Sequence, residues 1–363
     1  MTRRPPLLTV LTCLLGIWWL AIGTQAMAPS GGMHPYGLAA PPPKPAMTQA
    51  SVLAPTTACG LGSPCVYLPL INTPSQSQPN PGSRVSAVNL FNTAYLGSQG
   101  VPTGWNGNVS GCDPGVTTQA FRDSVLLRLN YFRKMAGIPP VTDFNGAYNT
   151  QDQAAALMMA ANHSLNHTPP SSWTCYTTTG YAGSSSSNLA LGAYGPAAID
   201  LYMDDGGVSS LGHRRWILYP QTQEMGTGDI SGSNWQEQSN ALKAWDDHIW
   251  DPRPSTLYDF VAWPPPTHIP YQVVYPAWSF AVANADFSGA SVAVSLNGAS
   301  LPVTVSRLPN GYGENTLAFS FYGGYAWPRP SSDTAYQIAI SNVVVNGAAR
   351  SYTYTVTVID PAG

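Results

Sequence analysis

Apolar side chains recur every three or four positions in a stretch that begins near residue 119 and ends at Gly137. This spacing places them on one face of a helix. Thr117 and Thr118 are both suited to cap the start of the helix, and Gly137, followed by two prolines, ends it. The sequence therefore predicts an amphipathic helix whose buried face consists of Phe121, Val125, Leu126, Leu129 and Phe132.

Two further helices are predicted before residue 206. The stretch 149–163 carries Ala154, Leu157, Met158 and Ala161 on one face, and we interpret this stripe as core rather than as a cofactor site. The stretch 196–205 is shorter and begins with Pro196, a residue that favours the first helical turn.

The pattern changes at about Val261, where apolar and polar residues begin to alternate. Alternation places successive side chains on opposite faces of a strand. The alternating runs are short and are separated by Gly, Asn and Pro turns, which is typical of an antiparallel sandwich. We predict an immunoglobulin-like β-sandwich domain over residues 261–363, with its valines and isoleucines in the core.

The chain begins with the pattern of an export signal over residues 1–28. Two arginines precede an apolar run over residues 7–23, and the small residues Ala26 and Ala28 follow it. We predict cleavage near one of these alanines, with an uncleaved membrane anchor as the alternative. After removal of the signal we expect no transmembrane span and a protein that is secreted or held in the cell envelope.

The sequence between the signal and the first predicted helix has no clear period. Residues 29–58 are rich in Pro and Ala and include PPPKP, so we predict an extended linker. Residues 59–116 contain short apolar pieces between Pro, Asn and Gly clusters. For this second segment we expect an ordered but irregular lead-in.

Four cysteines remain once Cys13, which lies inside the export signal, is removed with it. An even number in an exported chain predicts two disulfides. Three pairings are open, and proximity along the chain favours Cys59 with Cys65 and Cys112 with Cys175. Free thiols or a thiolate metal site are disfavoured, because no CxxC pair with ligand spacing exists.

The composition narrows the classes of function. Only 9% of the residues are charged and the formal net charge is −3, so the clustered Lys and Arg that nucleic-acid binding needs are missing. The abundance of Ser, Thr, Gly, Asn and aromatic residues is typical of a loop-rich extracellular protein. Nucleic acid is therefore not expected as a partner.

A series of polar and glycine motifs runs through the helical part of the chain. Their order and spacing over residues 117–232 resemble the bacterial type of the CAP superfamily (cysteine-rich secretory, antigen 5 and pathogenesis-related 1 proteins; SCP domain). GHRRWIL with the glycines after it is the most specific piece. The matching residues are Asn130 and Arg133, His167, Asn188 and Leu189, Asp205, Gly212 and His213, and Gly226 and Gly228.

The resemblance implies an α+β protein. A three-layer α-β-α CAP sandwich over residues 117–232 would be followed by a connecting segment, 233–260, and then by the β-sandwich. The resemblance also implies a central cleft lined by two histidines and two acids; in this chain the histidines are His167 and His213, and Asp205 is one acid. Two facing imidazoles can bind a divalent cation such as Zn²⁺, and an imidazole oriented by an acid can accept a proton. No other cofactor is predicted.

The chain departs from the family at the acids. Ser187 stands where the family has Glu before Asn-Leu, and the acid that ends the third helix is Asp205 or Asp204 rather than Glu. A missing carboxylate weakens a role in proton transfer, since an imidazole needs a partner that sets its tautomer. His167, His213 and Asp205 are therefore candidates both for catalysis and for binding a loosely held cation.

Two other histidines are interpreted as structural. His163 precedes His167 by four residues, the spacing of helical metal pairs, but no Glu follows it and the helix is ending. We expect a surface or capping residue. His248 lies among aspartates at 246, 247 and 251 and is expected in a polar loop.

The residues around the domain junction are also interpreted as structural. Arg214 and Arg215 are expected to pair with acids at a helix end or to pack on Trp216. The Pro-rich and aromatic segment 263–280 is expected to be an interdomain seam, with a surface that stacks on glycans or peptides as the alternative.

These observations predict a secreted CAP-domain protein that acts as a binding or interaction module at the cell surface or in the envelope. The ligand could be a lipid, a glycan or a protein. One alternative is a metal- or His-dependent hydrolase of peptide or cell-wall material that uses His167, His213 and Asp205. The other is a structural adhesin whose β-sandwich binds the ligand, so that deleting residues after about 255 would abolish binding.

Overall fold

The structure is a computed structural model that describes residues 82–363. The predicted signal (1–28), the predicted linker (29–58) and the predicted Cys59–Cys65 disulfide all lie outside the described residues. None of the helices described is long and apolar enough to cross a membrane.

The first described element is a helix inside the segment for which we expected an irregular lead-in. α1 (Arg84–Leu90) starts at the Ser83 cap and continues through the π-helical turn η1 (Phe91–Tyr95) and the 3-10 turn η2 (Leu96–Ser98). Its buried positions follow a helical period, but Val85 and Leu96 on the same helix are exposed. Because apolar residues occur on both faces of this helix, the sequence does not show the three- or four-residue apolar spacing that predicts a helix. The buried residues are Ala87, Phe91, Ala94 and Tyr95.

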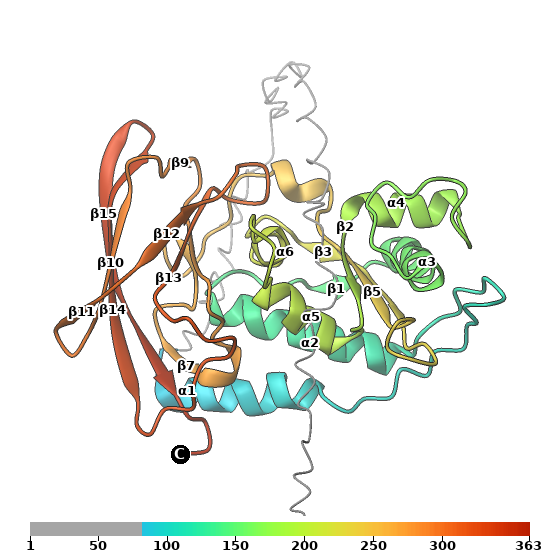
Figure 1. Ribbon diagram of the computed structural model, residues 1–363, viewed down its shortest axis with the longest axis horizontal. Helices are drawn as coiled ribbons and strands as arrows, with labels where there is room; N and C mark the ends of the chain where they lie inside the picture. Colours follow the sequence, from blue (N-terminus) through green and yellow to red (C-terminus); the bar gives the residue numbers. More distant parts are fainter. Residues whose placement is uncertain (1–81) are drawn as a thin grey trace, which may run out of the picture. The chain divides into compact units, whose positions relative to one another are not determined.

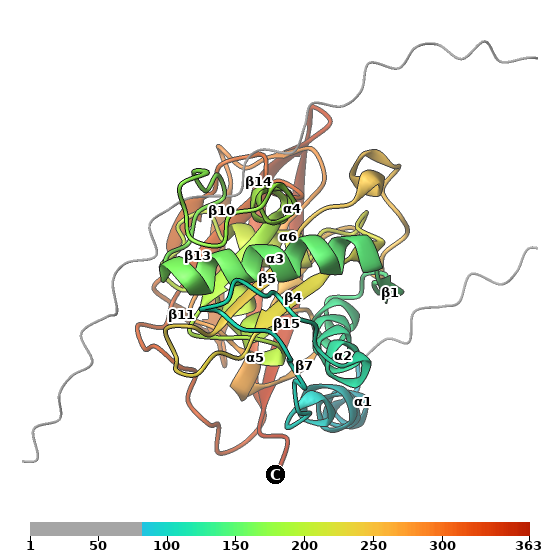
Figure 2. The same cartoon turned by 90° about the vertical axis from the view of Figure 1, so that its right-hand side faces the viewer.

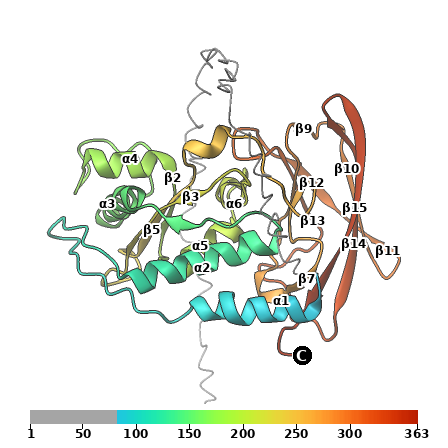
Figure 3. The same cartoon turned by 180° about the vertical axis from the view of Figure 1, so that it is seen from behind.

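The first predicted helix is confirmed as α2 (Gln119–Met135). The Thr118 hydroxyl accepts a hydrogen bond from the backbone N–H of Phe121 and so caps the helix. Figure 3 shows α1 beneath α2, and the buried face of α2 packs on η1 and on α5.

Two helices cover one face of an antiparallel three-stranded sheet. They are α3 (Gly146–Asn162), which confirms the second predicted helix, and α4 (Thr178–Ser186), which the sequence pattern does not predict. Figure 2 shows α3 lying across β4 and β5. The strands, in sheet order, are β2 (Ser187–Leu191), β5 (Ser239–Lys243) and β4 (Thr227–Ile230).

The segment predicted to connect the two domains supplies the central strand of this sheet. In β5, Leu242 pairs with Asn188 on one side and with Thr227 on the other. Every residue of β5 is buried, so the apolar and polar alternation that marks a half-exposed strand is missing from its sequence, SNALK. The sheet therefore extends past residue 232, where we had placed the end of the domain.

The opposite face of the sheet is covered by α2, α5 (Pro196–Asp204) and α6 (Gly212–Ile217). α5 confirms the third predicted helix, with Pro196 in its first turn. Together with α3 and α4 these helices make three layers, visible in Figure 1. Beside them lies a two-stranded parallel sheet, β1 (Asp143–Phe144) and β3 (Glu224–Met225), and the chain leaves through the 3-10 turn η3 (Asp247–Trp250).

Two further sheets form the β-sandwich predicted for the C-terminal part, and the α+β class is confirmed. All neighbouring strands run antiparallel except β7, which is parallel to β15. The first sheet has the order β12 (Thr304–Arg307), β13 (Thr316–Ser320), β8 (Trp278–Ala281) and β6 (Val261–Trp263). The second has the order β11 (Ala299–Leu301), β10 (Ser291–Leu296), β14 (Thr334–Val345), β15 (Ala348–Ile359) and β7 (His268–Pro270), with β9 (Ala285–Asp286) also on β14, and η4 (Tyr271–Val273) follows β7.

The three-layer part and the sandwich share one hydrophobic core. The ring of Trp263 on β6 lies 5.1 Å from the ring of Phe132 on α2. Trp263 is fully buried, as expected for a seam, and Tyr271 is partly buried. Trp278 is also fully buried, but it packs inside the sandwich on rings such as Phe319 and Trp327.

Buried arginines cross the same seam, and their partners differ from those we expected. The Arg214 guanidinium donates to the carbonyls of Met203 (2.6 Å) and Ala277 (2.7 Å). Arg215 donates to the Pro309 carbonyl at 2.8 Å. Neither side chain forms an ion pair with a carboxylate among the described residues. Both hold the sandwich to α6 instead.

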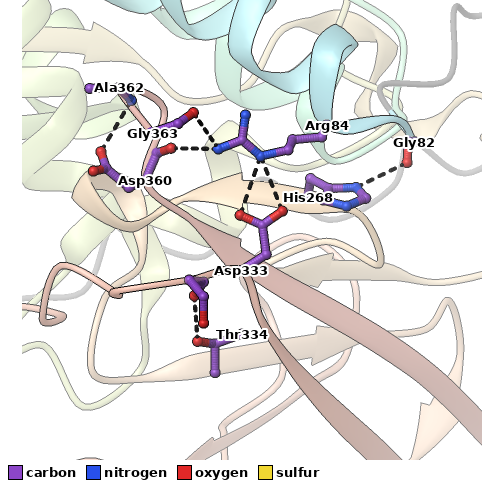
Figure 4. Close-up of polar contacts among 9 residues, drawn as sticks. Gly82, Arg84, His268, Asp333, Thr334, Asp360, Ala362 and Gly363 are labelled. Atoms are coloured by element: carbon purple, nitrogen blue, oxygen red, sulfur yellow. Dashed lines mark hydrogen bonds and ion pairs between the residues drawn. The ribbon is translucent and has the colours of Figure 1, made fainter.

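Arg84 ties the start of α1 to the end of the sandwich (Figure 4). Its Nε lies 3.1 and 3.2 Å from the two carboxylate oxygens of Asp333, and Nη2 donates to the carbonyls of Asp360 and Gly363 at 2.9 Å. Nδ1 of His268 lies 3.2 Å from the Gly82 carbonyl. The helix that precedes the three-layer part is therefore anchored on the sandwich.

Candidate functional site

Asp205 determines where α6 begins. It is the C-cap of α5 and has left-handed backbone geometry (φ 52°), which turns the chain toward α6. Its Oδ2 accepts the backbone N–H groups of His213 (3.0 Å) and Arg214 (3.3 Å). A carboxylate that accepts the first amides of a helix stabilises the start of that helix. Asp205 therefore positions α6 and, with it, His213.

The same carboxylate orients the His213 ring. Asp205 Oδ1 lies 2.7 Å from Nδ1 of His213, and because a carboxylate only accepts, Nδ1 carries the hydrogen. The neutral ring then has its lone pair on Nε2. The Asp205 side chain is fully buried, whereas 13% of the His213 side chain is exposed. The geometry suits an imidazole that accepts a proton or binds a cation from one side.

Tyr202 supports the His213 ring from α5. The two ring centroids are 5.3 Å apart. The Tyr202 hydroxyl donates to Asn240 Oδ1, on the central strand, at 2.8 Å. Burial raises the pKa of Tyr202 well above its ordinary value, so this hydroxyl stays protonated and acts as a structural donor.

His167 is fixed by the end of α4. Its Nδ1 lies 2.8 Å from the Ser184 carbonyl, and because a carbonyl only accepts, Nδ1 carries the hydrogen here too. The side chain is buried. Both predicted cleft histidines therefore have their lone pair on Nε2 when neutral, the form that binds metals.

The donors for a complete metal centre do not come together. Within residues 82–363 no group of three or more His, Cys, Asp and Glu side chains is placed to hold a metal ion. The Asp205 oxygens already accept three hydrogen bonds. The set does not fit a three-ligand site. Zn²⁺ binding by the two imidazoles of His167 and His213 stays a prediction.

Ser187, where the family has an acid, faces a different carboxylate. Its hydroxyl donates to Oδ1 of Asp152 on α3 at 2.6 Å, and Asp152 Oδ2 accepts the backbone N–H of Lys243 at 3.0 Å. Burial raises the pKa of Asp152 to about 7, and this effect outweighs the Ser187 hydrogen bond and the Lys243 charge. The sequence analysis does not identify Asp152 as a candidate site residue, because Asp152 precedes the alanine and methionine stripe of a helix that is interpreted as core.

Lys243 lies beside this acid. Its ammonium group donates to Ser186 Oγ at 2.8 Å and lies 4.6 Å from the centre of the Tyr148 ring. Burial lowers the pKa of Lys243, with the Asp152 charge acting in the opposite direction. Ser186, Ser187, Asp152 and Lys243 thus form a buried polar cluster on the α3 side of the sheet.

Three other residues of the motif series act as scaffold. Asn188 Nδ2 donates to the His213 carbonyl at 3.2 Å and so joins β2 to α6. Asn130 exchanges two hydrogen bonds with the backbone of Val141, at 2.8 and 2.9 Å. Arg133 donates to the carbonyls of Ile217 (2.7 Å) and three other residues, and burial lowers its pKa to about 9. Asn188 and Arg133 thus hold the two ends of α6, and Asn130 fixes the chain that follows α2.

The remaining predicted residues have structural places. Cys112 and Cys175 form a disulfide with a Cα–Cα distance of 5.1 Å, which confirms that predicted pair. His163 is the left-handed C-cap of α3. His248 lies on η3 with its Nδ1 3.1 Å from Asp246 Oδ2.

Two cavities of about 420 and 330 Å³ lie along α3, and neither is lined by His167 or His213.

Comparison with known proteins agrees with this geometry. Residues 126–249 match the family model described as CAP, the cysteine-rich secretory protein family. The match begins within α2 and ends on η3, so it includes β5. A search of curated proteins found no match to this chain.

Proposed function

Residues 126–249 form a CAP domain, and on this basis we propose that the protein is an exported binding module of the cell surface or envelope. Its cleft would present the His213 imidazole to a ligand. The family match supports an interaction role. The export pattern in residues 1–28 and the Cys112–Cys175 disulfide support a location outside the reducing cytosol.

The hydrogen bonds of Asp205 carry this proposal. One carboxylate orients the imidazole of His213 and caps the helix that bears it, so the ring is held in place before any ligand arrives. Ser187, at the position of the second family acid, is buried against Asp152. A cleft with one oriented imidazole and one carboxylate already in use suits recognition better than chemistry that needs two acids.

Calorimetric titration of the mature protein with Zn²⁺ tests the cleft. We expect micromolar binding that is lost in a His167→Ala, His213→Ala double variant. Asp205→Asn should weaken binding about tenfold, because the ring loses the partner that sets its tautomer. His163→Ala is the matched control, since His163 caps α3 and should leave the affinity unchanged.

Circular dichroism of each variant verifies that it is folded. If the double variant is folded and binds Zn²⁺ as well as the parent does, the two imidazoles are not the ligands. If the parent does not bind Zn²⁺ at all, the cleft is not a cation site and the search for the ligand moves to the C-terminal β-sandwich.

One observation favours a second function, hydrolysis of peptide or cell-wall material. An imidazole whose Nδ1–H is held by a buried carboxylate can take a proton from water at Nε2. Release of fragments from purified cell wall should then disappear in His213→Ala while the fold survives. Cell wall that stays intact with the parent protein argues for recognition alone.

The adhesin alternative needs a different test from the deletion of residues after 255. The sandwich shares its core with the CAP domain through Phe132 and Trp263, so truncation would expose apolar surface in both parts. A ligand contact that survives the double histidine variant in the intact chain would instead assign binding to the sandwich.

A further inference from the structure

Two cavities lie side by side along α3, and neither is lined by His167 or His213. The larger, of about 420 Å³, and the smaller, of about 330 Å³, both have Pro114 in their walls. Each falls in the size range of small-molecule sites in proteins. Figure 2 shows the segment between η2 and α2 running beside α3, and Gln153 Nε2 joins the two by donating to the Pro114 carbonyl at 2.9 Å.

One stripe of α3 lines both cavities. Asn149, Thr150 and Gln153 line the smaller cavity, and Ala154 and Leu157 line the larger. Residues spaced by three and four positions lie on one face of a helix. We call the two cavities together the α3 groove.

The two halves of the α3 groove differ in chemistry. The larger half has an aromatic and apolar wall that contains Trp173, Tyr176 and Leu157. The smaller half adds amides, hydroxyls and one cation, Arg122, to a wall that is also mainly apolar and includes Pro114 and Val116. No carboxylate lines either half.

Donors on both halves have unused hydrogen-bonding capacity. Within residues 82–363, Trp173 Nε1, Tyr176 Oη and Asn149 Nδ2 have no hydrogen-bond partner, although Asn149 Oδ1 accepts the backbone N–H of Thr227 at 2.8 Å. These residues line the groove, so donors on them that have no protein partner are available to a ligand.

The wall opposite α3 is held rigidly. The Cys112–Cys175 disulfide lies in the wall of the larger cavity. The Pro114 carbonyl accepts hydrogen bonds from Trp105 Nε1 (2.8 Å) and from Gln153. A wall that is ordered before binding lowers the entropy cost of holding a ligand.

We propose that the α3 groove binds an oligosaccharide, at a second site beyond the cleft. A pyranose ring has a face of C–H bonds, which suits the aromatic wall, and a rim of hydroxyl groups, which suits the amides and hydroxyls. A lipid chain would desolvate the Asn149 amide and the Arg122 guanidinium without replacing their hydrogen bonds. A carboxylate on the sugar would meet the Arg122 guanidinium.

Titration calorimetry with two tetrasaccharides, neutral tetra-N-acetylchitotetraose and acidic tetragalacturonate, tests the proposal, with tetra-alanine as the peptide probe. We expect at least one sugar to bind. Trp173→Ala should weaken binding about tenfold or more, and Tyr176→Phe about three- to tenfold because it removes one hydroxyl. Trp235→Ala, in the loop between β4 and β5 where Trp235 is 61% exposed, is the matched control and should have no effect.

Trp173 also packs on the core beside α3, so its loss could unfold the chain. Tyr176→Phe removes one hydroxyl, and Asn149→Asp replaces the Nδ2 donor with a negatively charged oxygen while Asp keeps the acceptor for Thr227. Both keep the proposal testable, and the neutral sugar is the probe for Asn149→Asp because the new charge would repel an acidic one. His213→Ala should leave sugar binding intact, which separates this site from the cleft. The proposal is overturned if neither sugar binds, if tetra-alanine binds instead, or if binding ignores both conservative variants.

Discussion

At the scale of single residues, buried polar groups surround the two predicted site histidines. Asp205, Asp152 and Arg133 are all buried, and each is hydrogen-bonded. Asp205 orients the His213 ring, whereas Arg133 donates only to backbone carbonyls. Asp152 differs from both, because its pKa is raised to about 7 and its charge therefore changes near neutral pH.

We predict that Asp152 makes the protein less stable as the pH rises. A pKa of about 7 in the folded state lies well above the ordinary value for Asp. The protonated Asp152 side chain therefore contributes its full stabilisation to the free energy of unfolding below about pH 4. This stabilisation is lost progressively as the pH rises from there through 7. The loss between pH 5 and pH 8 should be about 3 kcal/mol. Urea unfolding at both pH values measures it.

Asp152→Asn isolates this contribution from that of other acids. Burial also raises the pKa of Asp200, Asp229 and Glu314, and these groups act in the same direction in both proteins. The free energy of unfolding of the variant should therefore fall less between pH 5 and pH 8 than that of the parent, by the contribution of Asp152. Equal slopes for the parent and the variant would mean that Asp152 does not titrate in this range.

At the scale of elements, α3 can lie on its sheet because glycines allow close approach. A side-chain Cβ at Gly228 on β4 would lie 2.0 Å from the backbone carbonyl carbon of Asp152 on α3. A Cβ at Gly183 on α4 would lie 2.3 Å from the Gln151 carbonyl oxygen. Backbone fills these positions, so no side chain can move aside.

Gly228→Ala should therefore destabilise the protein by about 3 kcal/mol or more, because α3 must shift from the sheet. Thermal unfolding followed by circular dichroism measures the change. Gly289→Ala is the matched control, since its Cβ would meet only the Asn342 carbonyl oxygen at 3.9 Å. A Gly228→Ala melting temperature equal to the parent's contradicts the close approach of α3 and β4.

At the scale of the whole molecule, the CAP domain and the sandwich are joined by core and by hydrogen bonds. Phe132 and Trp263 belong to one hydrophobic cluster that runs through both parts. Arg214 is fully buried between them and donates to carbonyls on each side. Two parts connected in this way should unfold together.

Calorimetry should accordingly show one unfolding transition for the described part of the chain. Arg214→Met should lower the stability by about 3 kcal/mol or more, because three carbonyls and a hydroxyl lose their donor. The exposed Arg350 on β15 provides the control substitution, Arg350→Met, with little expected effect. Two separate transitions, with only one moved by Arg214→Met, would show that the parts are independent.

The sequence by itself determined the elements whose patterns are local. Helices α2, α3 and α5 and the β-sandwich follow from apolar spacing, because one face of each is buried and the other is not. The ordered motif series identified the CAP domain, and proximity along the chain predicted the Cys112–Cys175 pair. The motif positions also predict His213 and Asp205 as site residues, and the structure shows that the two side chains are in contact.

Only the tertiary structure decided how distant residues meet. β5 is buried on both faces and carries no period, so its central place in the sheet comes from pairing with β2 and β4. The contact of Ser187 with Asp152 and the carbonyl partners of Arg214 join residues far apart in the chain. Such contacts depend on how the layers are stacked, which spacing along one chain does not specify.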